Sequence, residues 1–336
     1  MTLGGRSAHL PTMRILIVKT SSMGDVVHAL PAVSDILAHV PGAEIDWLVE
    51  APFAAIPKMH RGVRQVHVLR WRKWRKQLLQ RSTWAAMGDL RAQLRAQPYD
   101  KVIDLQGLVK SALWGRQALG PMVGYDRHSL REPLAACFYQ AHAPVSRTLH
   151  AVTRCRHLVA HHLGYAMPQS QPDFGLSAPP LVDWQAPASA YAVLIPGASR
   201  PEKFWPQDRW HAIAQKLSAR GWTPVVLWGS PAEEGMAQEI AAASGGLVPP
   251  FLTVAQAASV LAGAKVVVGL DTGFSHLAAA LGRPTLGIYC DHEPGLAGIT
   301  GPAWVRSIGG KGQVPGLASV SELVDEQMMQ AELSKD

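Results

Sequence analysis

The segment from Leu270 to Thr285 carries residue types suited to holding an anionic ligand. It reads LDTGFSHLAAALGRPT and follows a run of three valines at 266–268. A short β-branched run predicts a buried strand, and Asp271-Thr272-Gly273 marks a point where a helix can begin with unpaired N–H groups. Those groups and the helix dipole both favour negative charge. We therefore expect a phosphate-bearing ligand here, with His276 one turn further along, although a lone histidine is more often simply buried or capping.

A second polar loop, KTSSMGD at 19–25, follows the apolar run at 14–18. Gly24 permits a tight turn, and Asp25 stands where the next helix is expected to open. An aspartate in that place most often caps the helix. The alternative is a general base that takes a proton from an acceptor hydroxyl. The residues alone leave both interpretations open, and the loop matches neither the dinucleotide fingerprint nor the P-loop pattern.

Two further segments carry charge. In PGASRPEKFWP at 196–206, Ser199 and Lys203 could reach a phosphate, Lys203 as a point charge; the alternative is an ordinary polar loop. The run RWRKWRK at 70–76 has three interpretations: a solvated basic face, a surface that stacks nucleic-acid bases, or a site for an anionic sugar or lipid headgroup. Composition does not choose among these.

Metal and hydrolase signatures are absent from the sequence. It contains no D-x-D, no H-E-x-x-H and no G-x-S-x-G, so no metal or cofactor is expected. The three cysteines, Cys137, Cys155 and Cys290, are widely spaced, which argues against a disulfide framework and suits a reducing cytoplasm.

Predicted strands and helices alternate along the whole chain, which indicates an α/β fold with parallel sheets. The expected strands are 14–18, 45–49, 66–69, 101–105, 192–195, 224–228, 265–268 and 285–289. The expected helices are 26–39, 84–96, 108–117, 131–139, 150–163, 207–219, 232–243, 254–262, 275–281 and 319–335, the last starting at Ser319 or Ser321. A length of 336 residues favours two domains, and the Pro- and Ser-rich stretch 168–190 is the predicted linker.

The overall composition describes a globular chain that favours anionic partners. Hydrophobic residues make up 48% and charged residues 17%, with a net charge of +7. Residues 1–12 are expected to be a disordered extension or an artefact of start-site choice, and no membrane-spanning helix is expected.

Four motifs occur in a fixed order: RILIVKTSSMGD at 14–25, IDLQGLVKS at 103–111, REPL at 131–134 and DTGFSH at 271–276. Together they resemble the lipopolysaccharide heptosyltransferases of glycosyltransferase family 9, which are inverting enzymes of GT-B architecture. The resemblance runs from Met13 to about Gly298. It implies two Rossmann-like doubly wound domains facing a central cleft, 13–167 for the acceptor and 191–318 for the donor, followed by a C-terminal helix at 319–336.

The resemblance also implies an activity and its partners. Heptose would pass from ADP-heptose to a Kdo residue of Kdo2-lipid A, without a cofactor or an obligatory divalent ion. The enzyme would be a monomer on the anionic cytoplasmic face of the inner membrane and would not bind nucleic acid.

Residue roles follow from the same resemblance. Asp25 would be the general base. The donor would be held by Ser199, Lys203, Glu233, Leu252, Asp271, Thr272, Gly273 and His276. The acceptor would be held by Ser22, Gly24, Arg70, Arg72, Lys73, Lys110, Arg131, His150 and Arg154.

The sequence departs from the family pattern at two places. Ala198 stands where a hydroxyl residue is usual, and CDHEP at 290–294 replaces a Gly-Pro-Thr-Asp-Pro-like loop. The alternatives are a sister heptosyltransferase with another acceptor, a sugar-nucleotide sensor without turnover, and a nucleic-acid-binding protein.

Overall fold

The computed structural model describes residues 12–333. Residues 1–11 of the predicted extension lie outside this range. The chain forms two compact units. Unit 1 comprises residues 1–21, 29–147 and 153–169, and unit 2 comprises 22–28, 148–152 and 170–336.

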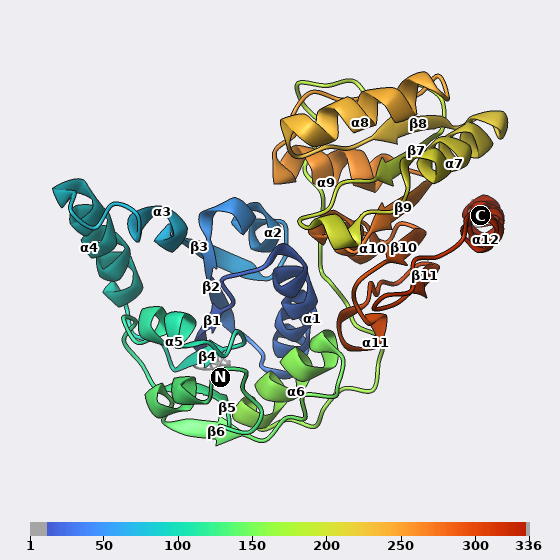
Figure 1. The fold of residues 1–336 in the computed structure, drawn as a ribbon. Helices are drawn as coiled ribbons and strands as arrows, with labels where there is room; N and C mark the ends of the chain where they lie inside the picture. The colour runs from blue at the N-terminus through green and yellow to red at the C-terminus, as the bar shows by residue number, and fades with distance from the viewer. Residues whose placement is uncertain (1–11, 334–336) are drawn as a thin grey trace, which may run out of the picture. The chain divides into compact units, whose positions relative to one another are not determined.

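Unit 1 is built on a parallel six-stranded sheet with the order β3-β2-β1-β4-β5-β6 (Figure 1). The strands are β1 (Arg14–Val18), β2 (Glu44–Glu50), β3 (Val63–Leu69), β4 (Lys101–Asp104), β5 (Met122–Tyr125) and β6 (Ala141–Ala143). The helices are α1 (Met23–His39), α2 (Ala55–Lys58), α3 (Trp71–Trp74), α4 (Arg81–Arg95), α5 (Val109–Gly115) and α6 (Ala151–Leu163), with 3₁₀ turns at Ala51–Phe53 and Pro133–Phe138. The first residues of α1 and α6 belong to unit 2.

Unit 2 contains a parallel five-stranded sheet with the order β11-β10-β9-β7-β8. Its strands are β7 (Tyr191–Ile195), β8 (Thr223–Val226), β9 (Val266–Leu270), β10 (Thr285–Tyr289) and β11 (Val305–Gly309). Its helices are α7 (Gln207–Ala219), α8 (Pro231–Ala242), α9 (Val254–Gly263), α10 (Gly273–Ala280), α11 (Pro294–Ala297) and α12 (Leu317–Leu333), with a 3₁₀ turn at Pro201–Lys203. The central strands are buried on both faces, as parallel strands covered by helices must be.

The two parallel sheets confirm the predicted fold class, and several local predictions were wrong. The helix expected at 131–139 is a 3₁₀ turn over Pro133–Phe138, in which Ala135 is the one buried residue, so it lacks the buried apolar face that stabilises most α-helices. Helix α12 starts at Leu317 rather than at Ser319 or Ser321. Helix α1 starts at Met23, so Asp25 lies in its first turn rather than opening it.

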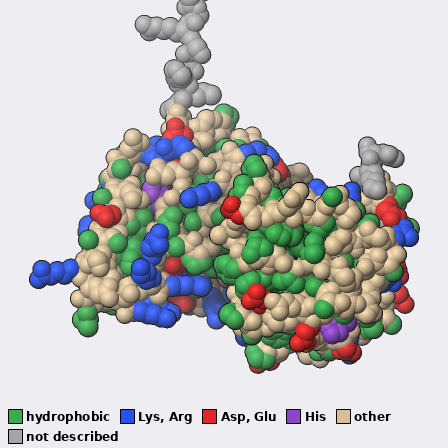
Figure 2. All heavy atoms as spheres, turned by 90° about the horizontal axis from the view of Figure 1, so that it is seen from above, with side chains coloured by type: hydrophobic (Ala, Val, Ile, Leu, Met, Phe, Trp, Pro, Cys, Tyr) green, Lys and Arg blue, Asp and Glu red, His purple; other side chains and the backbone are tan. Residues whose placement is uncertain are grey.

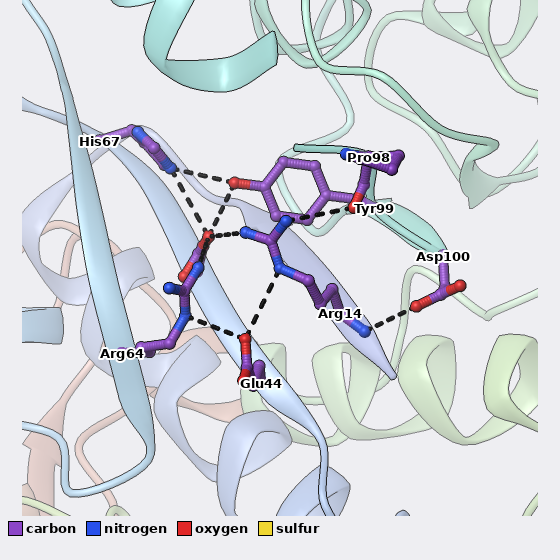
Figure 3. Close-up of polar contacts among 8 residues, drawn as sticks. Arg14, Glu44, Arg64, His67, Pro98, Tyr99 and Asp100 are labelled. Atoms are coloured by element: carbon purple, nitrogen blue, oxygen red, sulfur yellow. Dashed lines mark hydrogen bonds and ion pairs between the residues drawn. The ribbon is translucent and has the colours of Figure 1, made fainter. Parts of the chain in front are cut away.

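A buried polar network anchors the amino-terminal side of the unit 1 sheet (Figure 3). Asp46 on β2 accepts hydrogen bonds from Arg64 Nη2 at 2.7 Å, Tyr99 Oη at 2.8 Å and Arg14 Nη2 at 3.3 Å. Burial raises the pKa of Asp46, but hydrogen bonds from His67, Tyr99 and Arg64 outweigh it and hold that pKa below its usual value. The network ties β1, β2 and β3 together at the end of the sheet opposite to the loops that carry candidate site residues.

Candidate active site

The residues of unit 2 that are predicted to bind the sugar donor meet where the strand order of the sheet reverses. Strands β7 and β9 are neighbours, with β8 on one side and β10 on the other. The loops that leave their carboxyl ends therefore lie side by side, which is the usual ligand position in open α/β sheets. Lys203 comes from the loop after β7 and Asp271 from the loop after β9, and Lys203 Nζ lies 2.5 Å from Asp271 Oδ2. Topology brings together two residues that are 68 positions apart.

Asp271 organises the charge at this point. Burial alone raises the pKa of its carboxyl group, but hydrogen bonds from His276 and Lys203 outweigh burial and lower the pKa to about 2. His276 is buried, and its Nε2 lies 3.5 Å from Asp271 Oδ1. The carboxylate thus stays ionised at neutral pH and fixes a lysine and an imidazole next to the start of α10.

The start of α10 presents polar groups without partners. Thr272 is the N-cap residue, yet its side chain makes no capping hydrogen bond. Within residues 12–333, neither Thr272 Oγ1 nor His276 Nδ1 has a hydrogen-bond partner, although both atoms are buried. A buried polar group left unpaired is costly. Ser275 N and His276 N already donate to Thr272 O, so the candidate contacts for an anion are these two side-chain atoms and the N–H groups of Gly273 and Phe274.

Three other predicted donor residues lie around this centre in unit 2. Glu233 accepts a hydrogen bond from Gly229 N at 2.7 Å, and a Cβ at Gly197 would approach its Cδ to 2.6 Å. Leu252 lines a small cavity together with Trp228 and Phe274, the second residue of α10. Ser199 is exposed, and no contact of its side chain ties it to the Lys203–Asp271 pair.

The segment 22–28, which contains the predicted base, belongs to unit 2 and packs on α10. Asp25 Oδ2 accepts hydrogen bonds from Ser22 N at 2.9 Å and Ser22 Oγ at 2.7 Å. A Cβ at Gly24 would lie 3.0 Å from His276 Cδ2, so a larger residue here would press on the His276 ring. Unit 2 therefore contains both Asp25 and the Lys203–Asp271 pair.

His28 is a site residue that the sequence analysis missed. Its ring lies 4.6 Å from that of His276 and 5.3 Å from that of His150, measured between centroids. His150 Nε2 also lies 3.0 Å from the carbonyl oxygen of Gly298, and burial is the main cause that lowers the His150 pKa. The signal available in the sequence was helical spacing, because His28 follows Asp25 by three residues and shares its face.

In unit 1, hydrogen bonds join the loops that follow β1 and β4, at the point where the strand order of this sheet reverses. Gln106 Oε1 accepts the N–H groups of Thr20 and Ser21, each at 3.1 Å, and Lys19 Nζ donates to Leu105 O at 3.0 Å. Gln106 lies inside the motif at 103–111, but the sequence analysis gave it no role. It holds the loop that leads to Asp25.

The predicted acceptor residues of unit 1 fall into different surroundings. Lys110 Nζ lies 3.4 Å from Oε1 of Glu50, a fully buried carboxylate at the end of β2 that the sequence analysis did not consider. Arg154 donates to Ser129 O at 2.7 Å and packs over the Tyr125 ring, so its guanidinium is already engaged.

The basic run 70–76 forms α3 and the residues on either side of it. Arg70, Arg72 and Lys73 are exposed there, and Arg131 is exposed on a separate loop. Arg72 lies over the Phe53 ring at 5.4 Å. Figure 2 shows Lys and Arg side chains projecting among hydrophobic ones on the left of the view.

The part of the chain that the structure describes contains neither a metal-binding cluster nor a membrane-spanning helix. No group of three or more His, Cys, Asp or Glu side chains is arranged to hold a metal ion there. No helix between residues 12 and 333 is long and apolar enough to cross a bilayer.

Two doubly wound parallel-sheet units, one with a candidate anion site at its strand reversal, and the close match to a solved heptosyltransferase define a glycosyltransferase of GT-B architecture. The family model for glycosyltransferase family 9 (heptosyltransferase) matches residues 87–313. The chain belongs to this family.

Close relatives carry the same family name. The chain is 43% identical to lipopolysaccharide heptosyltransferase 1 of Pseudomonas aeruginosa over 88% of this chain and 83% of that protein. It is also 43% identical to the enzyme of the same name from Escherichia coli K12, over 85% and 90%. Among solved structures, the E. coli heptosyltransferase WaaC with ADP matches at a TM-score of 0.86 and 40% identity, covering 94% of this chain and all of that one.

Proposed function

We propose that this protein transfers L-glycero-D-manno-heptose from ADP-heptose to a Kdo residue of Kdo2-lipid A, with inversion at the anomeric carbon. The observation that carries the donor assignment is the Lys203–Asp271 pair beside the unpartnered Thr272 Oγ1 and His276 Nδ1. It supplies a cation, a helix start and two unsatisfied polar atoms within one unit. The names of the relatives and the ADP bound to the similar solved structure support the same assignment.

The donor's diphosphate is the natural ligand for the start of α10. As the bond between the anomeric carbon and the diphosphate oxygen breaks, the electron pair passes to ADP. Lys203 and the N–H groups of the first turn of α10 then stabilise the growing negative charge. Because ADP is a stable anion, it can leave without a general acid. The apolar side chains of Leu252, Trp228 and Phe274 lie together in unit 2 and would contact the nucleobase of the donor.

Asp25 is assigned the proton transfer on the acceptor. Its carboxylate takes the proton of an acceptor hydroxyl while that oxygen attacks the anomeric carbon from the face opposite to ADP. Ser22 holds Oδ2 of this carboxylate through two hydrogen bonds, so the group has a fixed orientation on the first turn of α1. A fixed base contributes to the rate because the reacting atoms are already aligned.

The proposed acceptor and an anionic membrane surface both carry dense negative charge. Arg70, Arg72, Lys73 and Arg131 are exposed cations of unit 1, and the whole chain carries a net charge of +7. These residues would bind the carboxylates and phosphates of a Kdo-bearing lipid A. They also support peripheral attachment of the enzyme to an anionic bilayer.

The test is ADP release from purified protein supplied with ADP-heptose, with and without deacylated Kdo2-lipid A. We expect release that requires the acceptor, together with a product heavier by one heptose. Donor binding without release would instead favour a sugar-nucleotide sensor, and release only with an acceptor that already carries heptose would favour the sister specificity. Salt-sensitive binding to DNA with no donor binding would overturn the proposal.

A further inference from the structure

Unit 1 contains an apolar cavity that the heptosyl transfer reaction does not use. It has a volume of about 640 Å³ and is lined by residues of α3, α4 and α5. Its walls include Trp71, Trp84, Met87, Leu113 and Trp114. A cavity of this volume and composition is in the range that binds small molecules with large apolar parts.

The cavity is open to an apolar surface. Trp84 and Leu113 line it and are 58% and 49% exposed, and Leu79, in the α3–α4 connection, is fully exposed. Large apolar side chains that meet solvent at the mouth of a cavity mark a binding surface more often than a structural one. By contrast, Trp74 is buried, and its ring centroid lies 5.5 Å from that of Trp114, which lines the cavity.

The surroundings of the cavity are strongly basic. Residues 70–95, which supply α3 and α4, contain eight Lys or Arg residues and one acidic residue, Asp89. Two cations, Arg91 and Lys110, stand in the cavity wall itself. An apolar cavity with a cationic rim is complementary to an amphiphile that has an anionic head and a hydrocarbon tail.

We propose that this cavity binds an acyl chain of the acylated anionic acceptor while Lys110 and the neighbouring cations bind its head. This inference rests on the proposed function, since Lys110 lies both in the cavity wall and among the predicted acceptor residues. The tail would be held by α3, α4 and α5 of the same unit that binds the head. Acylation then adds affinity without touching the reacting atoms.

Gly88 offers a way to fill the cavity without removing any contact. It lines the cavity from α4, and a Cβ added there would have no heavy atom within 4 Å. Gly88→Phe therefore places a ring in the cavity, and replacing a helical glycine does not cost helix propensity. Gly235→Phe on α8 is the matched control, because a Cβ there also meets open space and the residue lies in unit 2.

The measurement is KM for Kdo2-lipid A with its acyl chains and for the fully deacylated form. For Gly88→Phe we expect KM to rise at least about tenfold for the acylated acceptor, the factor that burial of roughly two methylenes contributes. KM for the deacylated acceptor and for ADP-heptose, and kcat for the deacylated acceptor, should stay within about twofold of wild type, as should all values for Gly235→Phe. If KM for the acylated acceptor stayed at its wild-type value in Gly88→Phe, or rose by the same factor as KM for the deacylated acceptor, the cavity assignment would be overturned while the transferase stayed intact.

A binding assay separates this inference from the proposed function. Dodecyl phosphate, titrated below its micelle concentration, should change the tryptophan fluorescence of wild type and of Gly235→Phe but not of Gly88→Phe. That result would stand even if the enzyme used another acceptor. If Gly88→Phe instead lost only its binding to vesicles of phosphatidylglycerol and kept wild-type KM for the acylated acceptor, the occupant would be a bilayer lipid and the acceptor proposal would be wrong.

Discussion

Asp25 has two possible roles, as a helix cap and as a general base. The free energies expected for these roles differ enough for one pair of variants to separate them. Its Oδ2 accepts two hydrogen bonds from Ser22 at the start of a 17-residue helix. Removing such a capping interaction costs about 1 kcal/mol, a small part of the roughly 5–15 kcal/mol that keeps a domain folded. Losing a general base lowers the rate about 10²- to 10⁴-fold, equivalent to about 3–5 kcal/mol of activation free energy. The catalytic role therefore predicts the larger effect.

Asp25→Asn is the decisive variant because its amide oxygen can still accept the hydrogen bonds from Ser22. We expect kcat for heptosyl transfer to fall about 10²- to 10⁴-fold, with KM for ADP-heptose and the urea unfolding midpoint close to wild type. Asp25→Ala should show the same loss of kcat and an unfolding free energy lower by about 1 kcal/mol. The assay is acceptor-dependent ADP release, run beside equilibrium unfolding.

Helix α9 supplies a matched control for the capping contribution. Gln256 Oε1 accepts the N–H of Thr253 at 3.0 Å and its hydroxyl at 2.8 Å, the same arrangement as at Asp25. Gln256→Ala should therefore lose a similar amount of stability and keep wild-type kcat. If Asp25→Asn retained more than about a tenth of wild-type kcat, a factor far below that of a general base, Asp25 would be only a helix cap and the mechanism would need another base.

The remaining predictions concern charge. Lys203→Met should raise KM for ADP-heptose about tenfold, the value of a charge-assisted hydrogen bond, and leave acceptor KM unchanged; equal rises for both would refute the donor assignment. Arg131→Ala should weaken the affinity for the acceptor more than the affinity for ADP-heptose, and the same two titrations would check this. Because the folded pKa of Asp271 is about 2, below its unfolded value, its contribution to stability is present above pH 4 and is lost as the pH falls toward 2; Asp271→Asn should flatten the decline of the urea midpoint across that window. Asp46→Ala, which removes the buried acceptor shared by Arg14, Arg64 and Tyr99, should lower the unfolding free energy by about 1–3 kcal/mol.

The elements that the sequence predicted well are those whose burial is uniform. Strands β1 and β10 have the expected bounds because their apolar runs end at polar or glycine-containing loops. Strands β5, β6 and β11 were missed for a physical reason. β6 has three residues, β5 contains Gly124, and β11 alternates Val, Arg, Ser and Ile on a sheet edge. Short or edge strands are defined by their pairing partners, which a local pattern does not contain.

The candidate site likewise contains residues that the sequence identified and residues that it missed. Asp271 was identified from the motif at 271–276 and Lys203 from the charged loop at 196–206, but only the adjacency of β7 and β9 explains why they touch. His28 and Glu50 were missed because neither lies in a motif, and their importance comes from neighbours distant in the sequence. A motif names the residues at the end of a strand, whereas the strand order decides which of those ends meet.

The basic run 70–76 shows how structure chooses among interpretations that composition leaves open. Its interleaved tryptophans suggested base stacking when only the sequence was considered, a role that requires exposed ring faces. Trp74 is instead buried, and Trp71 lines the cavity with its ring 6.3 Å from that of Trp114. Trp71 thus lines an apolar cavity and Trp74 is buried, while the intervening cations are exposed. This separation of apolar and cationic groups matches an amphiphile with an anionic head better than a nucleic acid, whose bases would need the faces that Trp114 and its neighbours already cover.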